Sequence, residues 1–168
     1  MNYHQTEGIY YTDQQWIFEP MTGVSSVAHF PKHVYKYLVG RQGQTMAPTV
    51  MSRSRSQLQK CCLDMADALQ RRESQISPSH SDYLNRRITR MAKSIYIDSI
   101  KVIDSASKNA LIEFDNNLRN ANPTFYMQLA DACGRFSYIR IWRQHQNWPC
   151  VLFRMIMNTA LALKSKTN

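Results

Sequence analysis

The chain has little of several features that define common classes of protein. It has 168 residues but only five glycines and six prolines, which argues against a fold of many short strands joined by tight turns. Charged residues interrupt every apolar run, so the sequence predicts no membrane span. Its first eight residues have neither a basic nor an apolar stretch and do not resemble a secretory signal. We therefore expect an intracellular, cytoplasmic protein with no membrane partner.

Motifs of common enzymes and metal sites are missing as well. The sequence has no Gly-rich phosphate loop, no His-Glu-x-x-His and no Gly-x-Ser-x-Gly. Its four cysteines show no metal-ligand spacing. His29 and His33 are four residues apart, but Pro31 lies between them and no third ligand is near. We expect no catalytic residue, no bound metal and no cofactor, so we predict that the protein is not an enzyme.

Acidic residues are absent from the last 37 positions, 132–168, which contain six Lys and Arg residues. A second basic stripe lies upstream, at 86–101, and the whole chain has a net charge of +9. Clustered cations predict a polyanionic partner, and nucleic acid, either RNA or DNA, is the commonest one. The alternative is a basic protein whose cations are simply solvated. The candidate contact residues are Arg86, Arg90, Lys93, Lys101, Arg140 and Arg143.

Two of these arginines have a competing interpretation. Arg140 and Arg143 are neighbours on a helix and could instead form ion pairs with Asp131 or with acids of the second helix. The aromatic side chains of Tyr138 and Trp142 either stack on unpaired bases or pack inside the protein. Packing is the commoner role of aromatic residues at helical spacing.

The apolar residues from about position 54 onward repeat with the period of an α-helix. Four amphipathic helices are expected, and two of them have a readable start at Asn122-Pro123 and Asn147-Pro149. Residues 105–108 interrupt the pattern, and 110–114 are either a short helix or a continuation. The sequence thus predicts an all-α four-helix bundle over residues 54–166. The four apolar faces contain Leu58, Cys62, Met65 and Leu69; Leu84, Ile88, Met91, Ile95 and Ile103; Phe125, Leu129, Ala132, Phe136 and Ile139; and Leu152, Met155, Ile156 and Leu163.

The first 50 residues have a different texture, with four of the five glycines and five of the nine tyrosines. We expect an irregular N-terminal arm over 1–50. Within it, 9–18 is predicted to form a hairpin and 30–38 a short helix, and 42–56 has the composition of a linker. Aromatic residues such as Trp16, Phe18, Tyr35 and Tyr37 suit a protein interface. The alternative function is therefore a protein–protein adaptor or structural oligomer without direct nucleic-acid binding.

Three short motifs within residues 54–166 resemble a known family. Residues 86–95 read RRITRMAKSI, residues 130–132 read ADA and are followed by IRIWR at 139–143, and residues 152–157 read LFRMIM. They are similar to the four-helix-bundle family that includes the accessory variability determinant of diversity-generating retroelements and the proteins encoded in bacterial 23S ribosomal RNA intervening sequences. Phe153 stands where the family often has Gly, and the first 50 residues have no counterpart.

This resemblance implies a non-enzymatic accessory protein that binds a reverse transcriptase as well as nucleic acid. It also implies a basic homo-oligomer. Independently of the resemblance, the broad apolar arc of the second helix and the aromatic residues Trp142, Trp148 and Phe153 predict a homo-oligomer.

Overall fold

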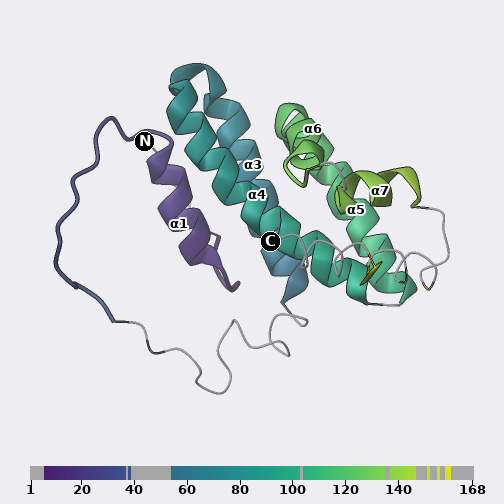
Figure 1. Ribbon diagram of the computed structural model, residues 1–168. Helices are drawn as coiled ribbons and strands as arrows, with labels where there is room; N and C mark the ends of the chain where they lie inside the picture. Colours follow the sequence, from purple (N-terminus) through teal and green to yellow (C-terminus); the bar gives the residue numbers. More distant parts are fainter. Residues whose placement is uncertain are drawn as a thin grey trace. The chain divides into compact units, whose positions relative to one another are not determined.

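The computed structural model describes residues 6–36, 38, 54–102, 104–134, 137–146, 151, 155, 158 and 159. In this part of the chain every regular element is a helix and no strand occurs, so the protein is all-α, as predicted (Figure 1). None of the described helices has the length and apolarity that a membrane span requires. The helices are α1 (Thr12–Met21), α3 (Arg55–Arg72), the 3-10 turn η1 (Glu73–Gln75), α4 (Pro78–Lys101), α5 (Ser105–Ala121), α6 (Pro123–Asp131) and α7 (Tyr138–Gln144).

The contacts of the chain divide it into two compact units, Met1–Leu84 and Asn85–Asn168. We call them the first unit and the second unit. The long helix α4 crosses the boundary, so its first turns belong to the first unit and the rest to the second. This division differs from the sequence-based one, which placed an arm at 1–50 and a bundle at 54–166.

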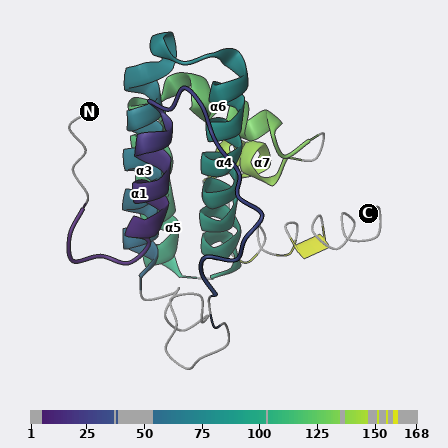
Figure 2. The same ribbon diagram turned by 90° about the vertical axis from the view of Figure 1, so that its left-hand side faces the viewer.

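The first unit is built on α3, which begins after Ser54 as the sequence predicts. Its apolar face buries Cys62, Met65 and Leu69, at the helical spacing expected of one packed side. The α1 helix lies alongside α3 (Figures 1 and 2). It contributes Phe18, which is fully buried. Phe18 is the one large apolar side chain of α1 that is buried, so it makes the main apolar contribution of this helix to the stability of the unit.

The hairpin predicted over 9–18 is wrong, because 12–21 form α1. Gln15, Phe18 and Thr22 are buried and recur at i, i+3 and i+7, which is one face of a helix. The chain enters α1 through Tyr11 in the left-handed region, with φ of 68°. The Tyr11 hydroxyl lies 3.0 Å from Ser54 Oγ, at the start of α3. Contact with α3 therefore outweighs the local β preference of the aromatic residues.

The short helix predicted over 30–38 is also wrong. Residues 24–36 contain neither helix nor strand in the structure. Positions 42–53 of the predicted linker lie outside the described residues, and its last residues, 54–56, begin α3.

The second unit contains most of α4 together with α5, α6 and α7. Of the predicted apolar stripe of α4, Leu84, Ile88 and Ile95 are buried and Met91 is half-buried, while Ile103 lies outside the described residues. The α5 helix begins at Ser105, where Asp104 caps it by accepting a hydrogen bond from the Ser107 amide at 2.6 Å. The break predicted at 105–108 is therefore a helix start, and α5 continues past 114 to Ala121.

The third predicted helix, running to Arg143, is divided into α6 and α7. Asn122 caps α6 as predicted, accepting from the Phe125 amide at 2.8 Å. The chain then turns at Gly134, whose φ of 77° is easily reached only by glycine. Ser137 caps α7 by accepting from the Arg140 amide. Of the fourth predicted helix, residues 151, 155, 158 and 159 are described and are helical, and the rest lies outside the described residues.

Candidate nucleic-acid interface

The positive charge of the protein belongs almost entirely to the second unit. Residues 1–84 contain eight Lys and Arg and seven Asp and Glu, a net charge of +1. Residues 85–168 contain thirteen Lys and Arg and five Asp and Glu, a net charge of +8. All six candidate contact residues lie in this second unit.

Four of the six lie on α4 and share one side of that helix. Arg86, Arg90 and Lys101 are exposed, and Lys93 is half-buried, with Nζ donating to the Ala132 carbonyl at 2.6 Å. Their spacing of 4, 3 and 8 residues keeps them on one helical side. Within the described residues, Arg90 and Lys101 form no ion pair. The α4 stripe therefore contains cations that are not neutralised by a neighbouring carboxylate.

Arg119 is a further cation, which the sequence pattern did not indicate. It lies in the last turn of α5 and is exposed, and no described residue forms an ion pair with it. The pattern failed here because it predicted only residues 110–114, as a short helix or a continuation, and Arg119 lies beyond them. The sequence does contain a signal for the longer helix. Asp104 caps the start of α5 and Asn122 caps the start of α6, so α5 can fill the whole interval between them. Each cap side chain accepts a hydrogen bond from the amide three residues later.

Arg140 forms an ion pair with Asp131, and both side chains remain largely exposed. This was the competing interpretation of Arg140. An exposed pair of this kind contributes little to stability, so the guanidinium can exchange its carboxylate for a phosphate at small cost.

Arg143 has a different environment, in a buried cluster. Its Nε donates to Asp115 at 2.8 Å, and these two side chains are only 12% and 3% exposed. A second nitrogen donates to the Tyr126 carbonyl at 2.8 Å and a third to the Tyr96 hydroxyl at 3.2 Å. The guanidinium carbon lies 3.4 Å from the centre of the Tyr126 ring. Four elements, α4 to α7, thus meet at this guanidinium.

Asp115 is the acceptor at the centre of the cluster. Besides Arg143, it accepts hydrogen bonds from the Tyr96 hydroxyl and, at 3.0 Å, from the Tyr126 hydroxyl. A buried carboxylate is costly unless its lone pairs are satisfied, and three donors satisfy this one. Arg143 is therefore a structural residue in this arrangement, with little surface left for a phosphate.

The cluster perturbs the pKa values of its members. Burial, and then the charge of Asp115, raises the pKa of Tyr96 well above its usual range. The same causes raise the pKa of Tyr126. Burial by itself lowers the pKa of Arg143, but Tyr96 and Asp115 more than offset it, so the net pKa is raised. The arginine stays charged and the tyrosines stay neutral at physiological pH, which suits a static hydrogen-bonded support rather than proton transfer.

The two aromatic residues weighed for base stacking are buried. Trp142 packs edge-on against Tyr96, with ring centroids 5.6 Å apart. The Tyr138 ring is buried, and its hydroxyl donates to the Lys93 carbonyl at 3.4 Å. Packing is thus the role of both rings in this structure, and Trp142 gives no exposed patch for an oligomer contact. Trp148 and Phe153 lie outside the described residues.

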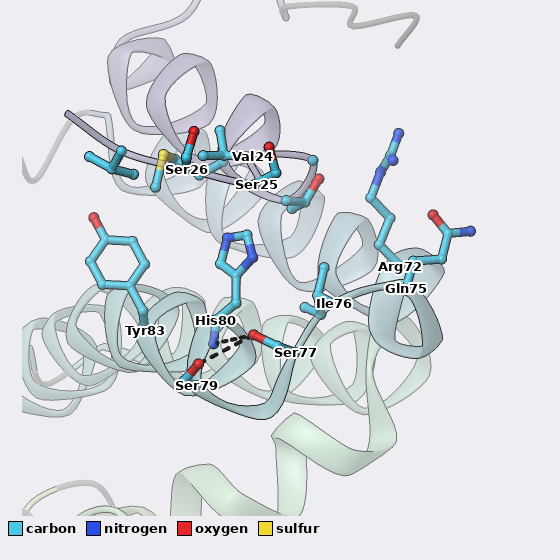
Figure 3. Close-up of a pocket in the computed structure, with 14 residues that line it drawn as sticks. Val24, Ser25, Ser26, Arg72, Gln75, Ile76, Ser77, Ser79, His80 and Tyr83 are labelled. Atoms are coloured by element: carbon cyan, nitrogen blue, oxygen red, sulfur yellow. Dashed lines mark hydrogen bonds between the residues drawn. The ribbon is translucent and has the colours of Figure 1, made fainter.

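A pocket of about 870 Å³ lies in the first unit, where the chain after α1 crosses the joint between α3 and α4. Figure 3 shows Val24, Ser25 and Ser26 on one side of it and the rings of His80 and Tyr83 on the other. The Ser77 hydroxyl, drawn at the start of α4, accepts from the His80 amide at 3.4 Å. None of the six candidate contact residues lines this pocket.

No group of three His, Cys, Asp or Glu side chains within the described ranges is placed to hold a metal ion. No protein-family model, curated protein or solved structure matches the chain. The resemblance to the retroelement accessory family therefore stays a prediction.

Proposed function

We propose that the protein is a non-enzymatic accessory protein that binds RNA or DNA through a basic surface of its second unit. The observation that supports this most directly is the uneven charge, since +8 of the +9 lies in residues 85–168. The attraction between Lys or Arg and the phosphates of RNA or DNA does not depend on the nucleotide sequence and needs only clustered cations. It is strongest for cations that are not already bound to a carboxylate, and Arg90, Lys101 and Arg119 form no ion pair with another described residue.

The other predicted residues take graded roles in this proposal. Arg86 extends the α4 stripe toward the start of the second unit. Lys93 lies within the stripe but is half-buried and bonded to the end of α6. Arg140 exchanges its ion pair with Asp131 for one with a phosphate. Arg143 stays bound to the buried Asp115 and stabilises the helices that form the surface.

The finer statements taken from the family resemblance belong to the same proposal. We propose that the helices of residues 54–166 include a four-helix bundle, in which α6 and α7 together take the place of the third helix and α5 is an additional helix before them. A reverse transcriptase is then the proposed protein partner, and the basic surface contacts its template.

The proposal is tested by measuring affinity for one single-stranded RNA and one DNA of equal length over a range of salt concentrations. In R90Q/K101Q/R119Q we expect weaker binding to every sequence and a slope of log affinity against log salt that is smaller by roughly two to three. The matched control, K60Q/R71Q/R72Q, removes the same charge from the first unit and should bind like the parent. Equal loss in both variants would show that net charge alone matters. Unchanged binding in both would refute the proposed surface.

A protein–protein adaptor is the second candidate, and the exposed side chains of Trp16 and Tyr35 favour it. Binding through such anchors is mainly apolar and changes little with salt. Steep, log-linear loss of affinity with salt is expected only of the nucleic-acid surface.

A further inference from the structure

Residues 27–36 and Leu38 have no regular structure, and their apolar side chains are exposed. Val27 and Phe30 are each 75% exposed and Val34 is 92% exposed. Tyr35 and Leu38 are also exposed. Scattered apolar side chains on a surface are ordinary, but five large ones within twelve residues are typical of a binding segment. We call residues 27–36 and Leu38 the docking segment.

A second exposed apolar surface lies on the outer side of α1. The inner side of this helix buries Gln15 and Phe18, while Trp16 and Ile17 on the other side are 59% and 39% exposed. Asp13 is exposed on the same outer side, since 13, 16 and 17 are helical neighbours. The outer face of α1 is therefore apolar, with a carboxylate beside its two large side chains.

The two surfaces have opposite charge. Residues 1–31 contain Glu7, Asp13 and Glu19 and no Lys or Arg. Residues 32–63 contain six Lys and Arg and no Asp or Glu, and Lys32 and Lys36 lie within the docking segment. The Lys32 amide donates to the Phe30 carbonyl at 2.8 Å, so the chain turns between the Phe30 ring and this lysine. An apolar surface with lysines thus complements an apolar surface with carboxylates.

The docking segment does not cover α1 of its own chain. Residues 24–27 leave α1 along the pocket that Arg72, His80 and Tyr83 also line. The segment then swings away from α1 as an irregular trace (Figure 1). The exposure of both surfaces agrees with their separation within one copy.

We infer that the docking segment of one copy binds the outer face of α1 of a second copy, and that the reciprocal contact closes a symmetric dimer. Twofold symmetry makes the two contacts identical, because each chain offers one segment and one face. Each contact buries apolar side chains around Asp13 and places Lys32 or Lys36 beside it. The inference is independent of nucleic-acid binding, since its residues all lie in the first unit.

Sedimentation of the full chain over a range of concentrations tests this. We expect a species of twice the 19.6 kDa chain mass, with a dissociation constant weakened more than about tenfold in F30S/V34S and in W16S. Both changes are at exposed positions, so circular dichroism should show unchanged helix. The matched control, M127S, removes an exposed apolar side chain from α6 instead. It should leave association unchanged.

Mixing the two defective variants tests whether the contact is exchanged between copies. W16S retains an intact segment and F30S/V34S an intact α1 face, so their mixture should form a heterodimer with one good contact. Charge reversal adds a second check, because D13K and K32E should each weaken the dimer and the combined variant should regain part of the loss.

Three results would overturn the inference. A parent protein that stays monomeric at every concentration excludes the dimer. A dimer that F30S/V34S and W16S leave intact must use another surface. A monomer whose docking segment binds phosphatidylglycerol vesicles, with loss in F30S/V34S but not in W16S, assigns the segment to an anionic membrane instead.

Discussion

Each unit of the protein places one aspartate among several hydrogen-bond donors, and the two sites differ in burial. In the first unit, Asp64 accepts from Gln15 of α1 and pairs with Lys60, and the side chains of Asp64 and Lys60 are 36% and 52% exposed. In the second unit, Asp115 and its partner Arg143 are almost completely buried. A solvated carboxylate can lose its partners at little cost, whereas a buried one cannot. Similar contacts of an aspartate therefore contribute differently to the stability of the two units.

The same contrast explains how the second unit tolerates its charge. It has a net charge of +8, and its buried guanidinium is neutralised locally by Asp115. Cations such as Arg90, Lys101 and Arg119 lie at the surface, where water solvates them. The unit therefore keeps a basic surface while the charge of Arg143 in its interior is compensated.

The largest expected effect is that of D115N. This change leaves the Arg143 guanidinium buried without its carboxylate, so we expect the second unit to lose about 3–5 kcal/mol of unfolding free energy. Urea unfolding followed by circular dichroism measures it. Replacing the group by apolar residues, in Y96F/D115L/R143M, should cost much less, because neither a charge nor the Tyr96 hydroxyl then remains buried without a partner. If D115N were as stable as the parent, the cluster would not hold the second unit together.

Alkaline pH should weaken both units, starting at different values. Burial raises the pKa of Cys61 from 9.0 to about 11 and raises that of Cys62 still further. Burial also raises the pKa of Tyr96 from 10.0. A folded-state pKa above the unfolded value gives stability that is complete below the unfolded pKa and lost as pH rises through the window. The first unit should therefore begin to lose stability above pH 9 and the second above pH 10, by up to about 1.4 kcal/mol per pH unit for each group.

Unfolding measured at a series of pH values, with C61A/C62A and Y96F as separate variants, tests this order. C61A/C62A should remove the loss of stability of the first unit above pH 9. Y96F should remove part of the loss of stability of the second unit above pH 10. If the unfolding free energy of both units fell at the same pH, and neither variant changed this, the loss would not come from the cysteines or from Tyr96.

The smallest expected effect is that of D64N. Asp64 is partly exposed, and its amide replacement still accepts hydrogen bonds from Gln15 and Thr6. We expect a loss within about 1 kcal/mol, measured in the same way as D115N. A loss as large as that of D115N would remove the distinction between a solvated and a buried aspartate.

Local sequence signals predicted the helices that have readable caps and faces. The α3 helix begins directly after Ser54, Asn122 caps α6, and Leu84, Ile88 and Ile95 of the predicted α4 stripe are buried. These features depend on residues close together in the chain, so periodicity and capping chemistry are sufficient to find them.

The errors occurred where distant contacts decided the structure. Residues 12–21 include Trp16, Ile17 and Phe18, which favour strands, yet they form a helix because Phe18 and Gln15 are buried on the side that meets α3. The third predicted helix divides at Gly134, although its apolar spacing continues through the turn. Arg143 shows the same limit, since its spacing placed it with the surface cations.

The amino-acid sequence was enough to predict the all-α class, the uneven charge and the starts of α3 and α6, because these follow from composition, period and caps. Only the tertiary structure decided which cations are buried, which aromatic rings pack, and that α1 lies on α3. Ion pairs such as Arg143 with Asp115 join residues 28 positions apart. Whether two such residues come into contact depends on the path of the chain between them. A pattern of neighbouring residues cannot predict that path.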